Sequence, residues 1–218
     1  KDKNLHDKEY DKWKNNRKKL LKQHDLSNEI DKALEKSEFF DKGELRSLLE
    51  KYNDIFSRTS SDSGFSKDLI LSLQFKTEAD RMPFYATPYK TAEETGEKLK
   101  EKVEELMEAG ILEVCNSPWN SPIIGVTKKD GTIRVVNNYA VAVNKRLVMP
   151  RFPLESTRSI FGKVGREVSR LRKMYPKDDI HFTSMDFRSG YFSIPIEGSS
   201  RDVTAFSIGN MQVRYKKC

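Results

Sequence analysis

The stretch Phe182-Thr183-Ser184-Met185-Asp186-Phe187-Arg188-Ser189-Gly190-Tyr191 decides how the rest of this sequence is interpreted. An apolar run that begins at Ile180 leads to one carboxylate, Asp186, and this pattern predicts a strand that ends at the acid. A carboxylate at an exposed strand end suits Mg²⁺, which prefers carboxylate oxygens and substrate phosphates. The Ser189-Gly190 pair predicts a sharp turn, after which Tyr191 can wall the same pocket. A buried strand capped by an Asp turn is the plainer alternative.

The composition allows one or two domains in 218 residues, because 36% hydrophobic and 33% charged residues suffice for a modest core with polar segments outside it. A net charge of +7 favours a polyanionic partner without identifying one. Cys115 and Cys218 lack metal-ligand spacing and predict no disulfide framework, which suits an intracellular location, cytoplasmic or nuclear. No apolar run approaches the ~18 residues of a membrane span, so no membrane partner is expected. The charged start from Lys1 does not match a signal peptide.

Residues 1–60 are rich in lysine and helical in pattern. Their sparse apolar residues, such as Leu5 and Leu20, predict a weakly amphipathic, solvated helix. The clusters Lys12-Trp13-Lys14 and Arg17-Lys18-Lys19 suit contacts with phosphates. A solvated helix face, or a linker to an upstream domain, is the alternative.

Two capping boxes predict the starts of further helices. Asp41 with Glu44 begins one helix, and Thr91 with Glu94 begins another, which Gly110 ends in a left-handed cap.

Three segments predict strands. "DLILSLQF" (68–75) alternates apolar and polar residues and predicts a strand with one buried face, followed by an extended arm that carries prolines. Asp130-Gly131 and Gly209-Asn210 each separate two apolar runs and predict β-hairpins.

The order "MDFRSGYFSIPI" (185–196) resembles the first catalytic motif of reverse transcriptases from retrotransposons with long terminal repeats. The similarity is to the kind in which protease, polymerase, ribonuclease H and integrase share one polyprotein. Residues 110–134 resemble the fingers hairpin of these polymerases, with "GIL", "SPWNSP", "KKDG" and an arginine in one order. With "PRFPL" (150–154) and "LLEKYNDIF" (48–56), the resemblance covers most of the sequence from residue 45 to residue 210.

The resemblance implies an α+β fold, the fingers and partial palm of a right-hand polymerase with a helical N-terminal extension. Three regions are expected: a basic helical extension or connector (1–60), an extended arm and strand (61–90), and incomplete fingers with the first palm strands (91–218).

The resemblance also implies roles for single residues. Asp186 matches the metal-bridging catalytic aspartate, and the carbonyl of Phe187 matches an accessory metal ligand. Arg134 matches the arginine along the incoming triphosphate, and Lys128 or Lys129 matches the lysine at its terminal phosphate. Each has a plainer alternative: a solvated hairpin tip for the lysines, and a partner across the hairpin for Arg134.

Tyr191 matches the aromatic gate beneath the sugar, whose ring favours deoxynucleotides, although core packing is the alternative. After the fingers arginine the match breaks, because Asn138 replaces an acid and Ala140 replaces an arginine. This break places the template-side contacts in doubt. The connection before Asp186 is longer than usual and predicts a helix whose basic face suits a nucleic-acid backbone or plain solvation. The basic residues of that face are Lys163, Arg166, Arg170 and Arg172.

The paired aspartates that complete the family's metal site are not found, because Asp178-Asp179 precedes the first motif. Mg²⁺ is expected only with those aspartates, so the chain as given is expected to be inactive. Two functions follow. One is an RNA-directed DNA polymerase region of a polyprotein, acting on an RNA template and DNA primer. The other is a domesticated, non-catalytic scaffold that binds RNA or other protein chains in a large ribonucleoprotein assembly.

Overall fold

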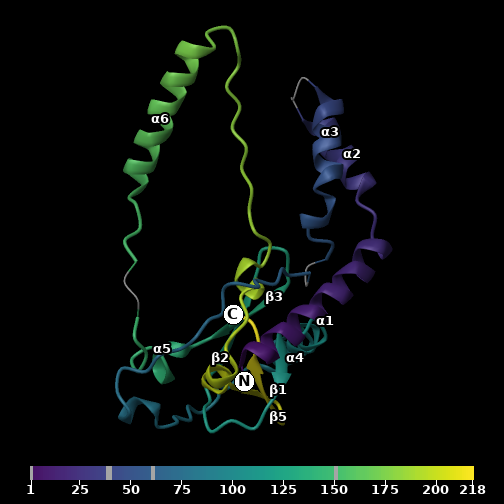
Figure 1. Ribbon diagram of the computed structural model, residues 1–218. Coiled ribbons are helices and arrows are strands. Elements are labelled where there is room, and N and C mark those ends of the chain that lie inside the picture. Colours follow the sequence, from purple (N-terminus) through teal and green to yellow (C-terminus); the bar gives the residue numbers. More distant parts are fainter. Residues whose placement is uncertain (1, 38–40, 60–61, 150–151) are drawn as a thin grey trace. The chain divides into compact units, whose positions relative to one another are not determined.

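The computed structural model describes residues 2–37, 41–59, 62–149 and 152–218 and mixes helices with antiparallel strands, as the α+β class requires. It divides into two units, Lys1–Val148 with Arg188–Cys218, and Met149–Phe187 (Figure 1). The first unit contains α1 (Asp2–Gln23), α2 (Ser27–Lys36), α3 (Lys42–Lys51), α4 (Glu93–Glu108), α5 (Tyr139–Ala142), α7 (Gly198–Arg201), β1 (Leu112–Val114), β2 (Ile123–Thr127), β3 (Ile133–Asn137), β4 (Phe206–Ile208) and β5 (Met211–Tyr215). The second unit contains α6 (Thr157–Met174).

The core of the first unit lies between α4 and two antiparallel sheets, β1-β5-β4 and β2-β3. Val103 of α4 packs among Ile111, Phe206 and Val213, and all four side chains are fully buried. The hairpin β2–β3 lies close to α4 because Gly125 has no side chain. A Cβ at that position would lie 3.0 Å from Cγ2 of Thr95 and 3.2 Å from Cγ of Leu99, both on α4, so the glycine permits the close packing.

The N-terminal ends of two helices test the predicted caps. The Asp41 side chain accepts a hydrogen bond of 2.8 Å from the backbone N–H of Glu44, which confirms that cap. The prediction for Thr91 is wrong: α4 begins at Glu93, and no side chain caps it. The Thr91 hydroxyl instead donates to the carbonyl of Tyr89 at 3.4 Å.

Glycines in the left-handed region confirm three predicted features. Gly110, at φ 69°, ends α4, and the N–H of Ile111 donates back to the carbonyl of Leu106 at 2.9 Å. Gly131, at φ 81°, follows Asp130 at the turn of β2–β3, and Gly209, at φ 57°, turns β4 into β5.

The predicted strand at 68–75 is wrong, since the segment forms only isolated bridges. Its backbone partners come from two separate places. Leu71 exchanges hydrogen bonds with residues 195–197, while Lys76 and Val148 bond across to Arg146 and Gln74. No single neighbouring strand therefore offers the continuous ladder that alternation alone had suggested.

α1 packs against the body through one face, so the expectation of a solvated helix holds only for the other face. Trp13 donates its indole N–H to the carbonyl of Ser63 at 3.0 Å, and a ring nitrogen of His6 lies 2.8 Å from the carbonyl of Lys67. Phe65 lies among the rings of His6, Tyr10 and Trp13, at centroid distances of 5.2 to 6.0 Å. Aromatic and polar side chains thus form the contact.

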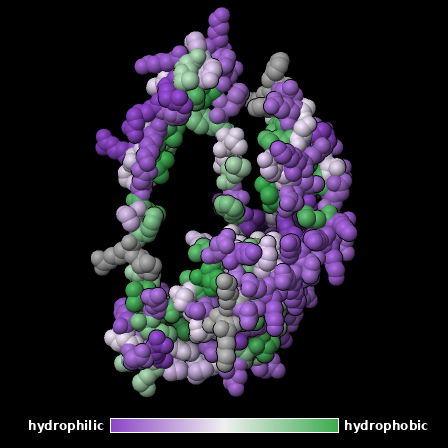
Figure 2. Space-filling view, in the orientation of Figure 1, coloured by the Kyte–Doolittle hydropathy of each residue, from purple (hydrophilic) through white to green (hydrophobic). Residues whose placement is uncertain are grey.

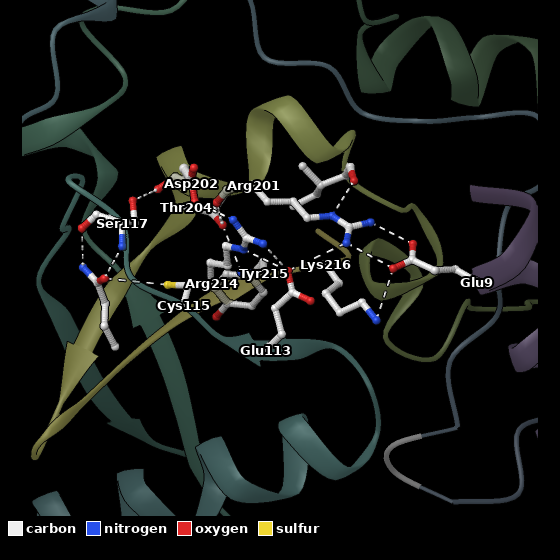
Figure 3. A network of polar contacts seen from close by, with 12 residues as sticks. Glu9, Glu113, Cys115, Ser117, Arg201, Asp202, Thr204, Arg214, Tyr215 and Lys216 are labelled. Carbon is white, nitrogen blue, oxygen red and sulfur yellow. Dashed lines mark hydrogen bonds and ion pairs between the residues drawn. The ribbon is translucent and has the colours of Figure 1, made fainter. Parts of the chain in front are cut away.

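A buried ion network fixes α1 to the sheet (Figure 3). The Arg201 side chain is 6% exposed and donates to both carboxylate oxygens of Glu9, at 2.7 and 3.1 Å, and to the carbonyl of Ile196. Arg214 extends the network by donating to Glu113 at 2.8 Å and Asp202 at 2.5 Å. Burial by itself would raise the pKa of the Glu9 carboxyl, but the hydrogen bonds and charge of Arg201 outweigh it and hold that pKa below its usual range.

The second unit contains α6 and an extended segment. The hydroxyl of Ser156 caps α6 by accepting from the N–H of Ser159 at 3.2 Å, and the helix confirms the prediction for this connection. Hydrophilic side chains follow one side of α6 and hydrophobic ones the other (Figure 2).

The predicted strand that ends at Asp186 is wrong, because residues 179–187 have no regular secondary structure (Figure 1). The side chains of Phe182, Met185 and Phe187 are 73 to 89% exposed. A strand needs neighbours for its N–H and C=O groups, and no described segment pairs with this one. Across the described parts of the chain, no helix is both long and apolar enough to cross a membrane.

Candidate active site

The tip of the β2–β3 hairpin presents the two predicted lysines. Lys128 and Lys129 are exposed, and the turn is closed by the N–H of Lys128, which donates to the carbonyl of Thr132 at 2.7 Å. The Asp130 carboxylate accepts from the N–H and hydroxyl of Thr132, at 3.0 and 2.6 Å. The backbone therefore holds the turn while both lysine side chains stay available to an anion.

Arg134 lies on the outward face of the same hairpin. Ile133 and Val135 point toward α4, so the alternation of a strand turns Arg134 to the exposed side. The residue directly opposite Arg134 is Val126, which excludes an acidic partner at that position. The hairpin thus brings three of the predicted substrate-binding cations, Lys128, Lys129 and Arg134, together on one element.

The base of the hairpin holds Asn137 and Asn138, and Asn138 is one of the residues that depart from the family pattern. The amide of Asn138 donates to the hydroxyl of Tyr89 at 2.9 Å and so ties the hairpin to the arm. The hydroxyl of Tyr215 donates to the Asn137 amide oxygen at 3.1 Å, and burial raises the pKa of Tyr215 to about 12. The amide nitrogen of Asn137 is buried without a hydrogen-bond partner among the described residues. The altered segment is therefore part of the packed structure.

Tyr191 is 79% exposed, so its ring does not belong to the described core. It follows Ser189, whose φ of 50° is the left-handed conformation that the predicted sharp turn requires. The next residue, Phe192, turns the other way and lies 6.5 Å from the ring of Tyr215. The Tyr191 ring is therefore exposed, whereas the ring of its neighbour Phe192 is packed.

Asp186 and Phe187 belong to the second unit, and the structure describes them separately from the hairpin. Both side chains are exposed. Among the described residues, no group of three or more His, Cys, Asp or Glu side chains is placed to hold a metal ion. One carboxylate is too few for a two-metal centre, so these residues alone do not form one.

The basic face of α6 divides into two kinds of residue. Lys163 pairs with Glu155 at 2.7 Å and Arg170 pairs with Glu167 at 2.5 Å, so local acids already engage both. Arg166 and Arg172 are exposed and have no ion-pair partner in the described part of the chain. A phosphate could therefore bind Arg166 and Arg172 without displacing a carboxylate.

The buried ion network around Arg201 was not predicted from the sequence. An arginine within "GSSRDV" gives no sign of burial, because its partner Glu9 is 192 residues away. The helical spacing of His6, Tyr10, Trp13 and Arg17 was an available signal. Hydrophobic patterning alone ranks such residues as solvent-facing.

The fold of this chain resembles that of reverse transcriptases. The chain superposes on the prototype foamy virus protease–reverse transcriptase with a TM-score of 0.67 at 22% identity, over 88% of this chain and 24% of that one. It also matches a foamy viral protease–reverse transcriptase in complex with an RNA/DNA hybrid, with a TM-score of 0.66 at 19% identity. These likenesses confirm the predicted fold.

The relatives in sequence narrow the class to retroelement polyproteins. The chain is 28% identical to the retrovirus-related Pol polyprotein from transposon 412 of Drosophila melanogaster, over 81% of this chain. It is 25% identical to that of transposon 297 over 78%, and 28% identical to the Pol polyprotein of feline endogenous virus ECE1 over 57%. The chain spans only 13% of the 412 polyprotein and 15% of the 297 polyprotein. No family model matches. The chain is a reverse transcriptase-like region related to retroelement Pol polyproteins, as residues 110–134 and 185–196 had indicated.

Proposed function

We propose that this chain supplies the fingers and early palm of an RNA-directed DNA polymerase that copies an RNA template from a DNA primer. The observation that supports it best is the hairpin, where Lys128, Lys129 and Arg134 stand exposed on one element with no acid opposite the arginine. A foamy viral relative in fold forms a complex with an RNA/DNA hybrid. The division at residues 60 and 90, and a cytoplasmic or nuclear location, remain predictions.

The hairpin cations bind the incoming triphosphate in this proposal. The guanidinium of Arg134 is planar and meets two phosphate oxygens at once. Lys128 or Lys129 adds a mobile point charge at the terminal phosphate. Both act on negative charge that grows on the leaving pyrophosphate, where preorganised cations stabilise the transition state.

Asp186 supplies one metal ligand, with the carbonyl of Phe187 beside it. Asp186 would need further acids beside it to hold a divalent cation, Mg²⁺ by its preference for carboxylate oxygens, and no such group is assembled among the described residues. In this proposal Tyr191 borders the sugar of the nucleotide, where its bulky ring would clash with a 2′-hydroxyl. We therefore expect deoxynucleotides to be preferred.

The basic face of α6 follows the nucleic-acid backbone. Within the predicted set of Lys163, Arg166, Arg170 and Arg172, the two unpaired arginines make the principal contacts. Replacement of Arg166 and Arg172 should therefore weaken binding more than replacement of Lys163 and Arg170.

Primer extension by the protein at its natural length tests this proposal. Asp186→Asn should abolish extension, whereas Asp178→Asn and Asp179→Asn, two exposed acids nearby, should leave it unchanged. Arg134→Ala should raise the KM for deoxynucleotides, and Tyr191→Ala should admit ribonucleotides. Extension that survives Asp186→Asn would reject Asp186 as a metal ligand.

A second function is a non-catalytic scaffold that binds RNA or protein. The replacements at Asn138 and Ala140 favour it, because the usual charged pair of the fingers is absent. The same assay separates the two functions. A scaffold would retain RNA in a binding assay and show no extension with any template.

A further inference from the structure

α1 has a second face that the proposed active site does not use. From Lys12 to Lys22, every ionisable side chain of the helix is basic. We propose that four exposed cations, Lys14, Lys18, Lys19 and Lys22, form an additional binding surface for the phosphate backbone of nucleic acid. We call this surface the lysine face. The inference rests on the proposed function, which supplies the nucleic acid.

The docking of α1 fixes the direction in which the lysine face points. Trp13 reaches the Ser63 carbonyl, and Arg17 pairs with Asp62 and donates to the carbonyls of Asp54 and Phe56 at 2.8 and 3.0 Å. These contacts hold one side of the helix against the body and prevent it from rotating.

Helical geometry then turns the lysines outward. Lys22 follows Trp13 by nine residues, or about two and a half turns, so it lies on the opposite side of the helix. Lys14, Lys18 and Lys22 form a row with a spacing of about 6 Å, from a rise of ~1.5 Å per residue. Hydrophilic residues cover this part of α1 in Figure 2. The body therefore presents a fixed row of positive charges.

The lysines of the lysine face are not engaged by acids among the described residues, unlike two lysines of α4. On α4, Lys98 pairs with Glu94 and Lys102 with Glu105, both at 2.6 Å. No described carboxylate forms an ion pair with any of the four lysines of the lysine face. Like charges at i and i+4 destabilise a helix. The helix dipole offsets this for Lys22 in the last turn, but not for Lys14.

The chemistry of the lysine face favours nucleic acid over a protein. The cores of protein interfaces are rich in aromatic residues and poor in lysine. The residue between these lysines on the helix surface is Asn15, which is polar. The lysine face therefore offers no exposed apolar side chain for such a core. Flexible ammonium groups bind phosphates as point charges and read no bases. Binding there should be independent of sequence and sensitive to salt.

Salt-dependent binding of the natural-length protein tests the inference. The probe is a labelled single-stranded RNA of mixed sequence, titrated at several KCl concentrations. Lys14, Lys18, Lys19 and Lys22 are all changed to Gln, which keeps good helix propensity. The plot of log affinity against log salt has a negative slope, and its magnitude should decrease by up to about 2.8, or ~0.7 for each lost contact. Affinity at low salt should fall at least about tenfold.

A matched variant separates the lysine face from the net charge. Lys32, Lys36, Lys42 and Lys51, exposed on α2 and α3, are changed to Gln and remove the same charge. This variant should bind RNA nearly as wild type does. An equal loss in both variants, or an unchanged slope in the first, would overturn the inference. Retention of an acidic peptide by the wild type alone, with unchanged RNA binding, would assign the lysine face to a protein and also overturn it.

The result is independent of catalysis. Asp186→Asn should bind the RNA with the wild-type slope while it loses primer extension. If the wild type shows no extension with any template but the slope still falls, the proposed polymerase fails and the lysine face stands.

Discussion

α1 and the segment 179–187 each differ from what their sequences predict. The sequence predicted a solvated helix for the first and a strand for the second. The charged helix is fixed to the body by Trp13, Glu9 and Arg17, whereas the apolar segment has side chains up to 89% exposed. The difference teaches that a polar side chain becomes buried when a specific partner meets it. An apolar run becomes a strand only when neighbours bond its backbone.

The largest expected effect concerns two arginines, Arg201, which binds Glu9 of α1, and Arg170 on α6 of the second unit. Arg201→Met leaves Glu9, whose side chain is 15% exposed, without its main partner, and should cost about 3–5 kcal/mol of unfolding free energy in urea denaturation. Arg170→Met removes an exposed pair on α6 and should leave the stability nearly unchanged.

A double variant tests the cause of that loss of stability. If the unpaired carboxylate causes it, adding Glu9→Leu to Arg201→Met should recover part of the stability. Equal losses for Arg201→Met and Arg170→Met would mean that α1 is not docked.

The aromatic residues of the two regions should differ next. Trp13→Ala removes a half-buried ring that contacts Phe65 and should cost about 2–3 kcal/mol. Phe182→Ala removes a ring that is 73% exposed and should change stability by no more than about 0.5 kcal/mol. Thermal and urea unfolding measure both variants, and a large loss for Phe182→Ala would show that segment 179–187 is packed.

A smaller effect is expected from Lys217, beside the docked helix. Burial, with the charge of Lys216, lowers the pKa of Lys217 from 10.5 to about 8. Between pH 8 and 10.5 the unfolded chain holds a proton that the folded chain has lost, so stability should rise with pH. Relative to Lys217→Met, the wild type should gain about 1.5 kcal/mol from pH 8 to 9.5, because the folded amine is half protonated at pH 8 and the slope approaches ~1.4 kcal/mol per pH unit only above that pH. A difference that is flat with pH would contradict the burial of this amine.

The sequence predicted most of the elements whose causes are local, with the Thr91 cap as the exception, because α4 begins at Glu93 without a side-chain cap. The Asp41 cap, the left-handed glycines and both hairpins depend on residues within a few positions of one another, and all are found. The strands at 68–75 and before Asp186 were wrong because a ladder depends on distant partners. The roles of the site residues came from the resemblance, and the exposure of Tyr191 and Arg134 came from the structure.

Hydrogen exchange of the backbone amides tests the central claim, that α1 belongs to the folded body and the Asp186 segment does not. In the 218-residue chain without nucleic acid, the amides of α1 beyond its first turn should exchange at least about a hundredfold more slowly than an unstructured chain. Those of residues 180–187 should exchange within about tenfold of that chain. Protection at 180–187 together with unprotected exchange across α1 would contradict the account.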